Sequence, residues 1–208
     1  MPDVAFLLRL PQQKVRRWIR DFWDSRLAEN YDNKYSWGEG KDKTTNFYTL
    51  IEFYVFYQLR ELKVSTKKIL MAHEEMASHL KTQYPFASSK VLTTGKSILF
   101  TLDDGTTIQA DKSKQIVFRE IIESFCKKIE FSENELAQRY WPLGKKHSII
   151  VDPHHQFGQP VIDNTNLLAE NIYNLYSAGE SIQFLSRLYD LKSNEVKDAI
   201  ELFNRNAA

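Results

Sequence analysis

The sequence contains very little cysteine and no long hydrophobic run. Cys126 is the single cysteine among 208 residues, so an internal disulfide is impossible, which fits the reducing cytoplasm. No apolar run reaches the roughly eighteen residues that a membrane-spanning helix needs. The opening residues, MPDVAFLLRL, lack the basic start, long apolar run and cleavage site of a signal peptide. We therefore expect a cytoplasmic protein with no membrane partner.

The net charge is also small, but the charges are unevenly distributed. The formal net charge is +1 at pH 7, which by itself favours no particular partner. From Val4 to Arg20 the chain has five cations and no acid, whereas from Lys145 to the end six cations face eight acids, a net of −2. A basic beginning and a mildly acidic end suggest two different partners.

Motifs of enzymes and metal sites are incomplete. Gly95–Ser97 has the end of a phosphate-binding loop, but Lys90 stands where the first glycine should be. His73 and His79 are six residues apart, about 600° of helix rotation, so they cannot chelate one ion from a single helix face. Cys126 has the apolar surroundings of a small core residue. We expect no enzyme, no catalytic residue, no metal and no cofactor.

The first segment, Asp3–Asp24, is predicted to form two helices around a tight turn. Pro11 interrupts the pattern, so one helix ends before it and the next begins there. Four residues of the second helix recur at helical spacing and form one apolar face, namely Val15, Trp18, Ile19 and Phe22. The polar segment Ser25–Thr45 is predicted to be a loop or a wing.

The middle of the chain changes from helical to strand periodicity. Phe47–Leu62 is a strongly aromatic helix, which suits either a buried core helix or a dimer surface. Ser65 can cap the next helix, which runs to about Leu80. Lys90–Ala110 has three short strands with turns at Thr-Gly and Asp-Gly dipeptides. Gln115–Lys128 returns to helical spacing.

The last third is predicted to be helical. Ser132 and Glu135 have the spacing of a capping box, which predicts a helix start. Trp141–Gly144 resembles a domain boundary, so we expect domains at residues 1–140 and 141–208. Three short helices should follow it: Thr165–Ala178 closed by Gly179, Ser181–Tyr189, and Ser193–Asn204.

The opening segment VAFLLRLPQQKVRRWIRDFW resembles the helix-turn-helix of MerR-like regulators. The likeness consists of an aliphatic-Pro turn followed by an aliphatic–Arg–Arg–Trp element. The polar residues of the second helix would then meet DNA: Gln12, Gln13, Lys14, Arg16, Arg17 and Arg20. An amphipathic helix with a merely solvated basic face is the alternative. The continuation FYTLIEFYVFYQLRELKVSTKKILMA is also similar to the MerR-like pattern.

The later segments YPFASSKVLTTGKSIL, QIVFREII, KKIEF and AQRYWP follow in an order similar to that of VapB-type antitoxins of toxin–antitoxin pairs. The stretch from IIVDPHHQFGQPVID to the end resembles the module called domain-of-unknown-function family 433. In that pattern His154 and His155 occupy a turn with no demand for ligands, and their neighbouring side chains should diverge. The family's Gly-Thr-Arg is replaced here by Asn164-Thr165-Asn166, so no arginine role carries over. Thr165 could still cap the next helix.

These resemblances imply a mainly α protein with a small antiparallel β-sheet, formed by a winged helix-turn-helix domain and a three-helix, homeodomain-like domain. They imply an antitoxin that neutralises a PIN-type ribonuclease toxin, binds operator DNA and forms a homodimer. The expected toxin-binding residues are Tyr173, Tyr176, Phe184, Tyr189 and Phe203, and core positions are the alternative for some of them. Two other classes stay open, a stand-alone MerR-like transcriptional regulator and a protein-interaction adaptor without DNA binding.

Overall fold

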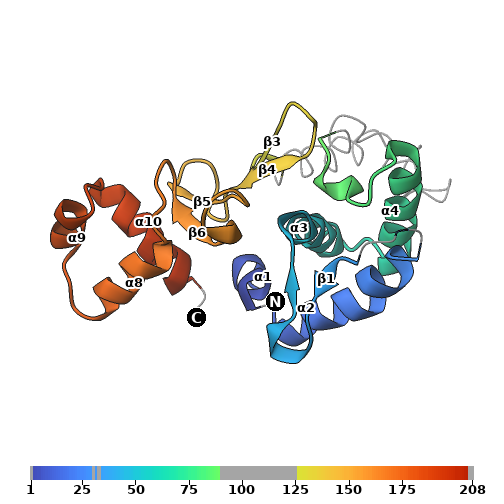
Figure 1. The fold of residues 1–208 in the computed structure, drawn as a ribbon, viewed down its shortest axis with the longest axis horizontal. Coiled ribbons are helices and arrows are strands. Elements are labelled where there is room, and N and C mark those ends of the chain that lie inside the picture. The colour runs from blue at the N-terminus through green and yellow to red at the C-terminus, as the bar shows by residue number, and fades with distance from the viewer. Residues whose placement is uncertain (1, 30, 32–33, 90–125, 206–208) are drawn as a thin grey trace. The chain divides into compact units, whose positions relative to one another are not determined.

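The computed structural model describes residues 2–29, 31, 34–89 and 126–205 (Figure 1). These residues are mostly helical and carry small antiparallel sheets, which confirms the predicted fold class at that level. The chain divides into two compact units. The amino-terminal unit contains Met1–Lys127 and Phe131–Ala137, and the carboxy-terminal unit contains Lys128–Glu130 and Gln138–Ala208. The predicted boundary between residues 140 and 141 stays a prediction.

The two predicted helices at the start of the chain are present. They are α1 (Pro2–Leu8) and α2 (Gln12–Trp18). Between them Arg9 adopts a left-handed conformation with φ of 53°, and the Leu10 N–H donates to the Ala5 carbonyl at 2.9 Å. The second helix does not end near Asp24 as expected, because α2 continues directly into the π-helix η1 (Ile19–Leu27).

The predicted loop or wing contains a short hairpin. Its strands are β1 (Ser36–Trp37) and β2 (Thr44–Thr45), and η2 (Gly40–Asp42) lies between them. Ser36 pairs with Thr45 in antiparallel register. Gly38 has φ of +74°, and a Cβ at this position would lie 2.7 Å from the Asp42 carbonyl oxygen. Only glycine therefore fits this turn without strain.

Two capped helices follow the hairpin, α3 (Phe47–Glu61) and α4 (Thr66–Leu80). The Asn46 side chain accepts a hydrogen bond from the Thr49 N–H at 2.8 Å, and Ser65 accepts one from the Lys68 N–H, which confirms the predicted Ser65 cap. These side chains satisfy N–H groups that have no partner inside the helix.

Helix α3 is the core of the amino-terminal unit. Trp23 is fully buried, and its ring centroid lies 4.5 Å from that of Phe53 and 5.1 Å from that of Phe56, both edge-on. Burying one such aromatic side chain stabilises the fold by roughly 2–3 kcal/mol. The buried positions surround most of the helix. Of the two roles considered for this helix, the core role is the observed one.

The larger described sheet has four strands, and it lies after the segment Lys90–Ala110 for which strands were predicted. The predicted strands at Lys90–Ala110 and nearly all of the predicted helix Gln115–Lys128 lie outside the described residues. The described sheet has the strand order β3-β4-β5-β6. Its strands are β3 (Ile129–Phe131), β4 (Ala137–Tyr140), β5 (Ile149–Val151) and β6 (Pro160–Ile162).

The predicted helix start at Ser132 is wrong, because this segment is the turn between β3 and β4. The Ser132 N–H donates to the Leu136 carbonyl at 2.8 Å, and the Glu135 N–H donates to the Ser132 carbonyl at 2.9 Å. Glu135 has φ of +64°, which no helix interior tolerates. A helix beginning here would be stopped by Pro142 within about two to three turns. Strand pairing of Tyr140 with Val151 forms instead.

The carboxy-terminal unit has the three expected helices, α8 (Ala169–Ser177), α9 (Ile182–Leu188) and α10 (Ser193–Asn204). Gly179, with φ of +106°, follows α8 as predicted, and Ser181 caps α9. Helix α8 begins later than expected because Thr165 is not its cap. The Thr165 hydroxyl donates to the Ile162 carbonyl at 2.7 Å and belongs to a turn after β6.

Candidate functional site

The candidate DNA-binding surface is the polar face of α2. The apolar residues Val15 and Trp18 are buried, which turns the remaining side chains outward. Gln12 and Gln13 are exposed in the first turn of the helix. The other predicted contact residues follow on α2 and the first turn of η1, with Lys14 and Arg16 half-buried and Arg17 and Arg20 exposed. The structure therefore brings the whole predicted set together on one short helical segment.

Five of these six side chains also line one groove of about 560 Å³. Lys14 is held there by aromatic rings, since its Nζ lies 5.2 Å from the Trp18 ring centroid and 5.5 Å from that of Tyr57. The buried Nε of Arg16 has no hydrogen-bond partner among the described residues. The lining residues are Pro11, Gln13, Lys14, Arg16, Arg17 and Arg20. A groove lined by four cations is suited to an anion.

Arg20 differs from the other cations because it has an acidic neighbour. Its Nε lies 2.7 Å from Asp21 Oδ1. The hydrogen bond to Asp21 raises the pKa of Arg20, and the same contact lowers the pKa of Asp21. Both side chains are exposed, so solvent screens this pair strongly. Asp21 directly follows the acid-free segment Val4–Arg20.

The five predicted toxin-binding residues have two different environments. Tyr173 on α8 and Phe203 on α10 stack with ring centroids 4.8 Å apart at 15°, so these two rings hold the helices together. Tyr176 and Phe184 are 40% and 47% exposed and are available to a partner. Tyr189 is half-buried just after α9.

Two exposed apolar residues of the same unit were missed. Leu188 is 53% exposed and lies one turn after Phe184 on α9. Phe157 is fully exposed and has φ of +55°, a conformation that costs energy for an aromatic residue. The i, i+4 spacing of Phe184 and Leu188 could have indicated the first. An aromatic residue directly before Gly158 in a polar turn was the available signal for the second.

The histidine pair lies in a turn after β5, as predicted. Asp152 is buried and organises the turn: its Oδ1 accepts the His154 N–H at 2.8 Å, and its Oδ2 lies 3.1 Å from His155 Nδ1. Arg139 Nε donates to the same Oδ2 at 3.2 Å. Burial tends to raise the pKa of Asp152, but the contacts from His154, His155 and Arg139 outweigh burial and lower that pKa.

One cluster has the residue types of a metal site. His147 Nδ1 lies 2.8 Å from Asp198 Oδ1 and 3.9 Å from Glu201 Oε2. The second Asp198 oxygen accepts the Ser148 N–H at 2.7 Å, and Glu201 pairs with Arg205 one turn later. These partners already satisfy both carboxylates. We therefore assign the cluster a structural role, in which it fastens the start of β5 to α10.

No helix in the described ranges has the length and apolar character needed to cross a membrane.

Comparison with known proteins identifies relatives of parts of the chain. Residues 149–202 match the family described as "Protein of unknown function (DUF433)", which covers β5 through most of α10. The Mycobacterium tuberculosis (strain ATCC 25618 / H37Rv) protein named "Putative antitoxin VapB45" is 28% identical over 91 residues, 43% of this chain and 38% of that protein. The chain thus aligns with well under half of this relative's length.

A solved structure shares the fold. The X-ray crystal structure of Rv2018 from Mycobacterium tuberculosis is similar to this chain with a TM-score of 0.72. The likeness covers 96% of this chain and 94% of that one at 16% sequence identity. At this identity the comparison establishes a common fold and nothing about activity.

Proposed function

We propose that this chain is a DNA-binding antitoxin. In this proposal the amino-terminal unit is a winged helix-turn-helix that binds operator DNA and represses its own operon. The carboxy-terminal unit binds and neutralises a PIN-type ribonuclease toxin. The observation that carries the antitoxin assignment is the sequence match to a relative named as an antitoxin, and the match of residues 149–202 to a family module supports it.

The exposed face of α2 supports the DNA-binding half of the proposal. A major groove about 12 Å wide accepts one helix, and the residues of its first turns reach base edges. Gln12 and Gln13 are exposed in this first turn, and glutamine pairs well with adenine. Arg16 and Arg17 suit guanine edges or backbone phosphates. The hairpin β1–β2 would serve as the wing.

The surface of the carboxy-terminal unit supports the toxin-binding half. Its net charge of −2 from Lys145 to the end disfavours a phosphate backbone. A ribonuclease binds RNA and therefore carries basic surface, which an acidic partner complements. Exposed Phe184 and Leu188 provide apolar area of the kind found at the centre of protein interfaces. A homodimer is expected, because one helix-turn-helix contacts only a half-site.

The salt dependence of DNA binding tests the first half. Replacing Arg16, Arg17 and Arg20 by alanine in the full chain removes up to three phosphate contacts. The slope of log K against log salt should then flatten by up to ~3 units for the promoter DNA of its own gene. Arg20 should contribute least, because Asp21 partly neutralises it.

A matched control removes three exposed cations elsewhere. The variant with alanine at Lys63, Lys67 and Arg187 loses the same charge from other elements. It should retain the parent slope. Equal slopes for the α2 variant and the parent at every salt concentration would refute DNA binding through α2.

A further inference from the structure

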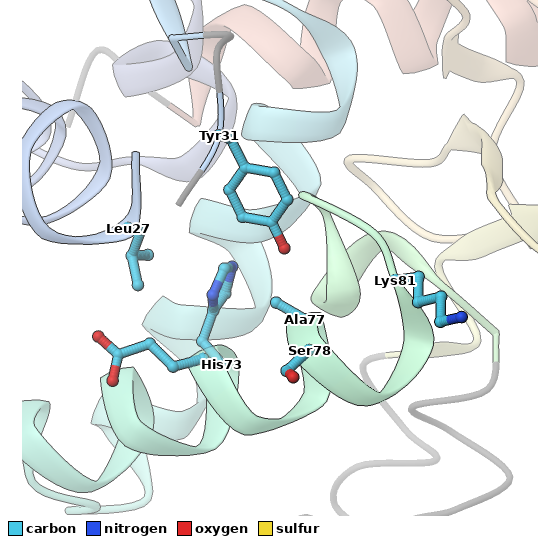
Figure 2. Close-up of a pocket in the computed structure, with 7 residues that line it drawn as sticks. Leu27, Tyr31, His73, Ala77, Ser78 and Lys81 are labelled. Carbon is cyan, nitrogen blue, oxygen red and sulfur yellow. The ribbon is translucent and has the colours of Figure 1, made fainter. Parts of the chain in front are cut away.

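The amino-terminal unit contains a pocket between η1 and α4, which Figure 2 shows in close-up. Its volume is about 420 Å³, which lies within the usual range for small-molecule sites. Tyr31 closes it on the side opposite α4 (Figure 2). Its lining residues are Leu27, Tyr31, His73, Glu74, Ala77, Ser78 and Lys81.

The inner wall of the pocket holds a buried histidine, and neither of its ring nitrogens has an aligned hydrogen-bond partner among the described residues. The His73 side chain is 1% exposed, and its Nε2 lies 2.7 Å from Glu52 Oε2, which is fully buried. A carboxylate oxygen only accepts, so we assign the ring hydrogen to Nε2. Nδ1 is then an acceptor, and it has no hydrogen-bond partner within the described part of the chain. A buried acceptor of this kind is expected to find a donor.

The other polar groups define what a ligand must carry. The Tyr31 hydroxyl donates to the Thr82 carbonyl at 3.0 Å, so its oxygen is left to accept. Arg26 Nη2 donates to Glu74 Oε2 at 2.7 Å and thereby offsets the acidic charge on the rim. Ser78 and Lys81 are exposed at the pocket and can donate. The pocket thus has hydrogen-bond acceptors at its inner end. At the solvent side it has the Lys81 ammonium group and the Ser78 hydroxyl.

The spacing along α4 fixes the size of the ligand. His73 and Ala77 lie one turn apart on α4, and the left-handed cap residue Lys81 lines the same pocket beyond the helix end. Their backbones span about 12 Å at ~1.5 Å per residue. Buried Leu27 and Ala77 form the apolar wall between the two polar ends. A flat ring with one polar group at each end, plus two hydrogen bonds, covers such a span.

We propose that this pocket binds a small aromatic hydroxy acid. The hydroxyl donates to His73 Nδ1 at the inner end, the ring lies against Leu27 and Ala77, and the carboxylate meets Lys81 and Ser78 at the mouth. This binding does not depend on DNA or toxin binding, so it can fail or succeed independently of the proposed function.

Titration of the full chain with 4-hydroxybenzoate tests the proposal. The ligand should shift the imidazole ¹³C–¹H NMR signal of His73, and calorimetry gives its affinity. Phenol keeps only the inner donor and benzoate only the carboxylate, so each should bind more weakly than 4-hydroxybenzoate. Lys81→Gln should lower the affinity for 4-hydroxybenzoate about tenfold, because one charge-assisted hydrogen bond is lost. The affinity for phenol should not change.

The control variant is Lys67→Gln, which removes an exposed cation from the first turn of the same helix. It should bind all three probes as the parent does. Both substitutions lie on the surface, so neither disturbs the buried Glu52–His73 pair. A His73 signal unmoved by millimolar 4-hydroxybenzoate would overturn the proposal. Equal losses in Lys81→Gln and Lys67→Gln would also overturn it.

Discussion

Glu52 connects three elements of the amino-terminal unit through its side chain. It is fully buried on α3, its Oε1 accepts the Phe86 N–H of η3 (Pro85–Ala87) at 2.8 Å, and its Oε2 lies 2.7 Å from His73 Nε2 of α4. Removing one partner of a buried pair leaves the other uncompensated, which costs more than the pair itself contributes. This carboxylate should therefore contribute strongly to the stability of the unit.

Glu52→Ala should lower the free energy of unfolding by about 3–5 kcal/mol, because it leaves His73 and the Phe86 N–H buried without a partner. Urea unfolding followed by tryptophan fluorescence measures the loss. Glu75→Ala removes an exposed carboxylate from α4 and should change stability by less than about 0.5 kcal/mol. Similar losses in the two variants would show that the buried contacts are not needed.

Asp152 should make the carboxy-terminal unit sensitive to acid. Its folded-state pKa is lowered, because contacts from His154, His155 and Arg139 outweigh the opposing effect of burial. A lowered folded pKa means that the stabilisation is present above the unfolded pKa and is lost as pH falls through the folded pKa. The parent should therefore exceed Asp152→Asn in stability at neutral pH, and this difference should shrink below about pH 4.

Urea unfolding of both proteins between neutral and acid pH checks this prediction. His154→Ala keeps the backbone N–H that bonds Asp152 and serves as the control, which should retain the acid response of the parent. A constant difference between parent and Asp152→Asn at all pH values would contradict it.

At the scale of elements, long periodic segments could be predicted and short ones could not. Helix α3 was expected at Phe47–Leu62 and runs over Phe47–Glu61, because fifteen residues define a period and Asn46 marks its start. Strands β3 and β5 have three residues each, too few to show alternation. The Ser132–Glu135 spacing fits both a capping box and a tight turn. The tight turn forms, because the flanking segments pair as strands.

Helix α9 is the element that we expect to bind the toxin. Phe184 and Leu188 lie one turn apart and are both about half exposed, so they form one apolar face. Replacing both by aspartate in the full chain should weaken toxin binding at least thirtyfold, or about 2 kcal/mol, the loss typical of central interface residues. Calorimetric titration of the purified toxin measures it.

Gln183→Asp is the control for this helix, since it adds the same charge at an exposed neighbouring position. It should bind the toxin nearly as the parent does. Retention of full affinity by the Phe184→Asp, Leu188→Asp double variant would place the toxin contact on another surface, and exposed Phe157 would become the next position to change.

The candidate sites show why the sequence predicted only part of them. The basic face of α2 is local, so charge and periodicity within Gln12–Arg20 were sufficient to place it. The Glu52–His73 pair joins residues 21 positions apart, and the His147–Asp198 contact joins residues 51 positions apart. Such contacts arise only when tertiary packing brings elements together. The sequence alone therefore does not indicate that these side chains are in contact.

At the scale of the whole molecule, two units of different surface character share one chain. The likeness to the Rv2018 structure covers 96% of the chain at 16% identity, so the arrangement of elements tolerates extensive sequence change. In the proposal, surface residues determine what the two units bind: the basic face of α2 in one unit and the acidic, partly apolar helices in the other. The antitoxin proposal requires both surfaces to act within a single protein.

The most direct test of the antitoxin proposal is an RNA-cleavage assay with the product of the neighbouring gene, which the proposal expects to be the nuclease. The purified full chain is added to that nuclease in increasing ratios, and cleavage of a substrate RNA is followed by gel. Cleavage should stop once the chain is stoichiometric with the nuclease, and size-exclusion chromatography should show one complex. Undiminished cleavage at a large excess of chain, with the two proteins eluting separately, would contradict the proposal.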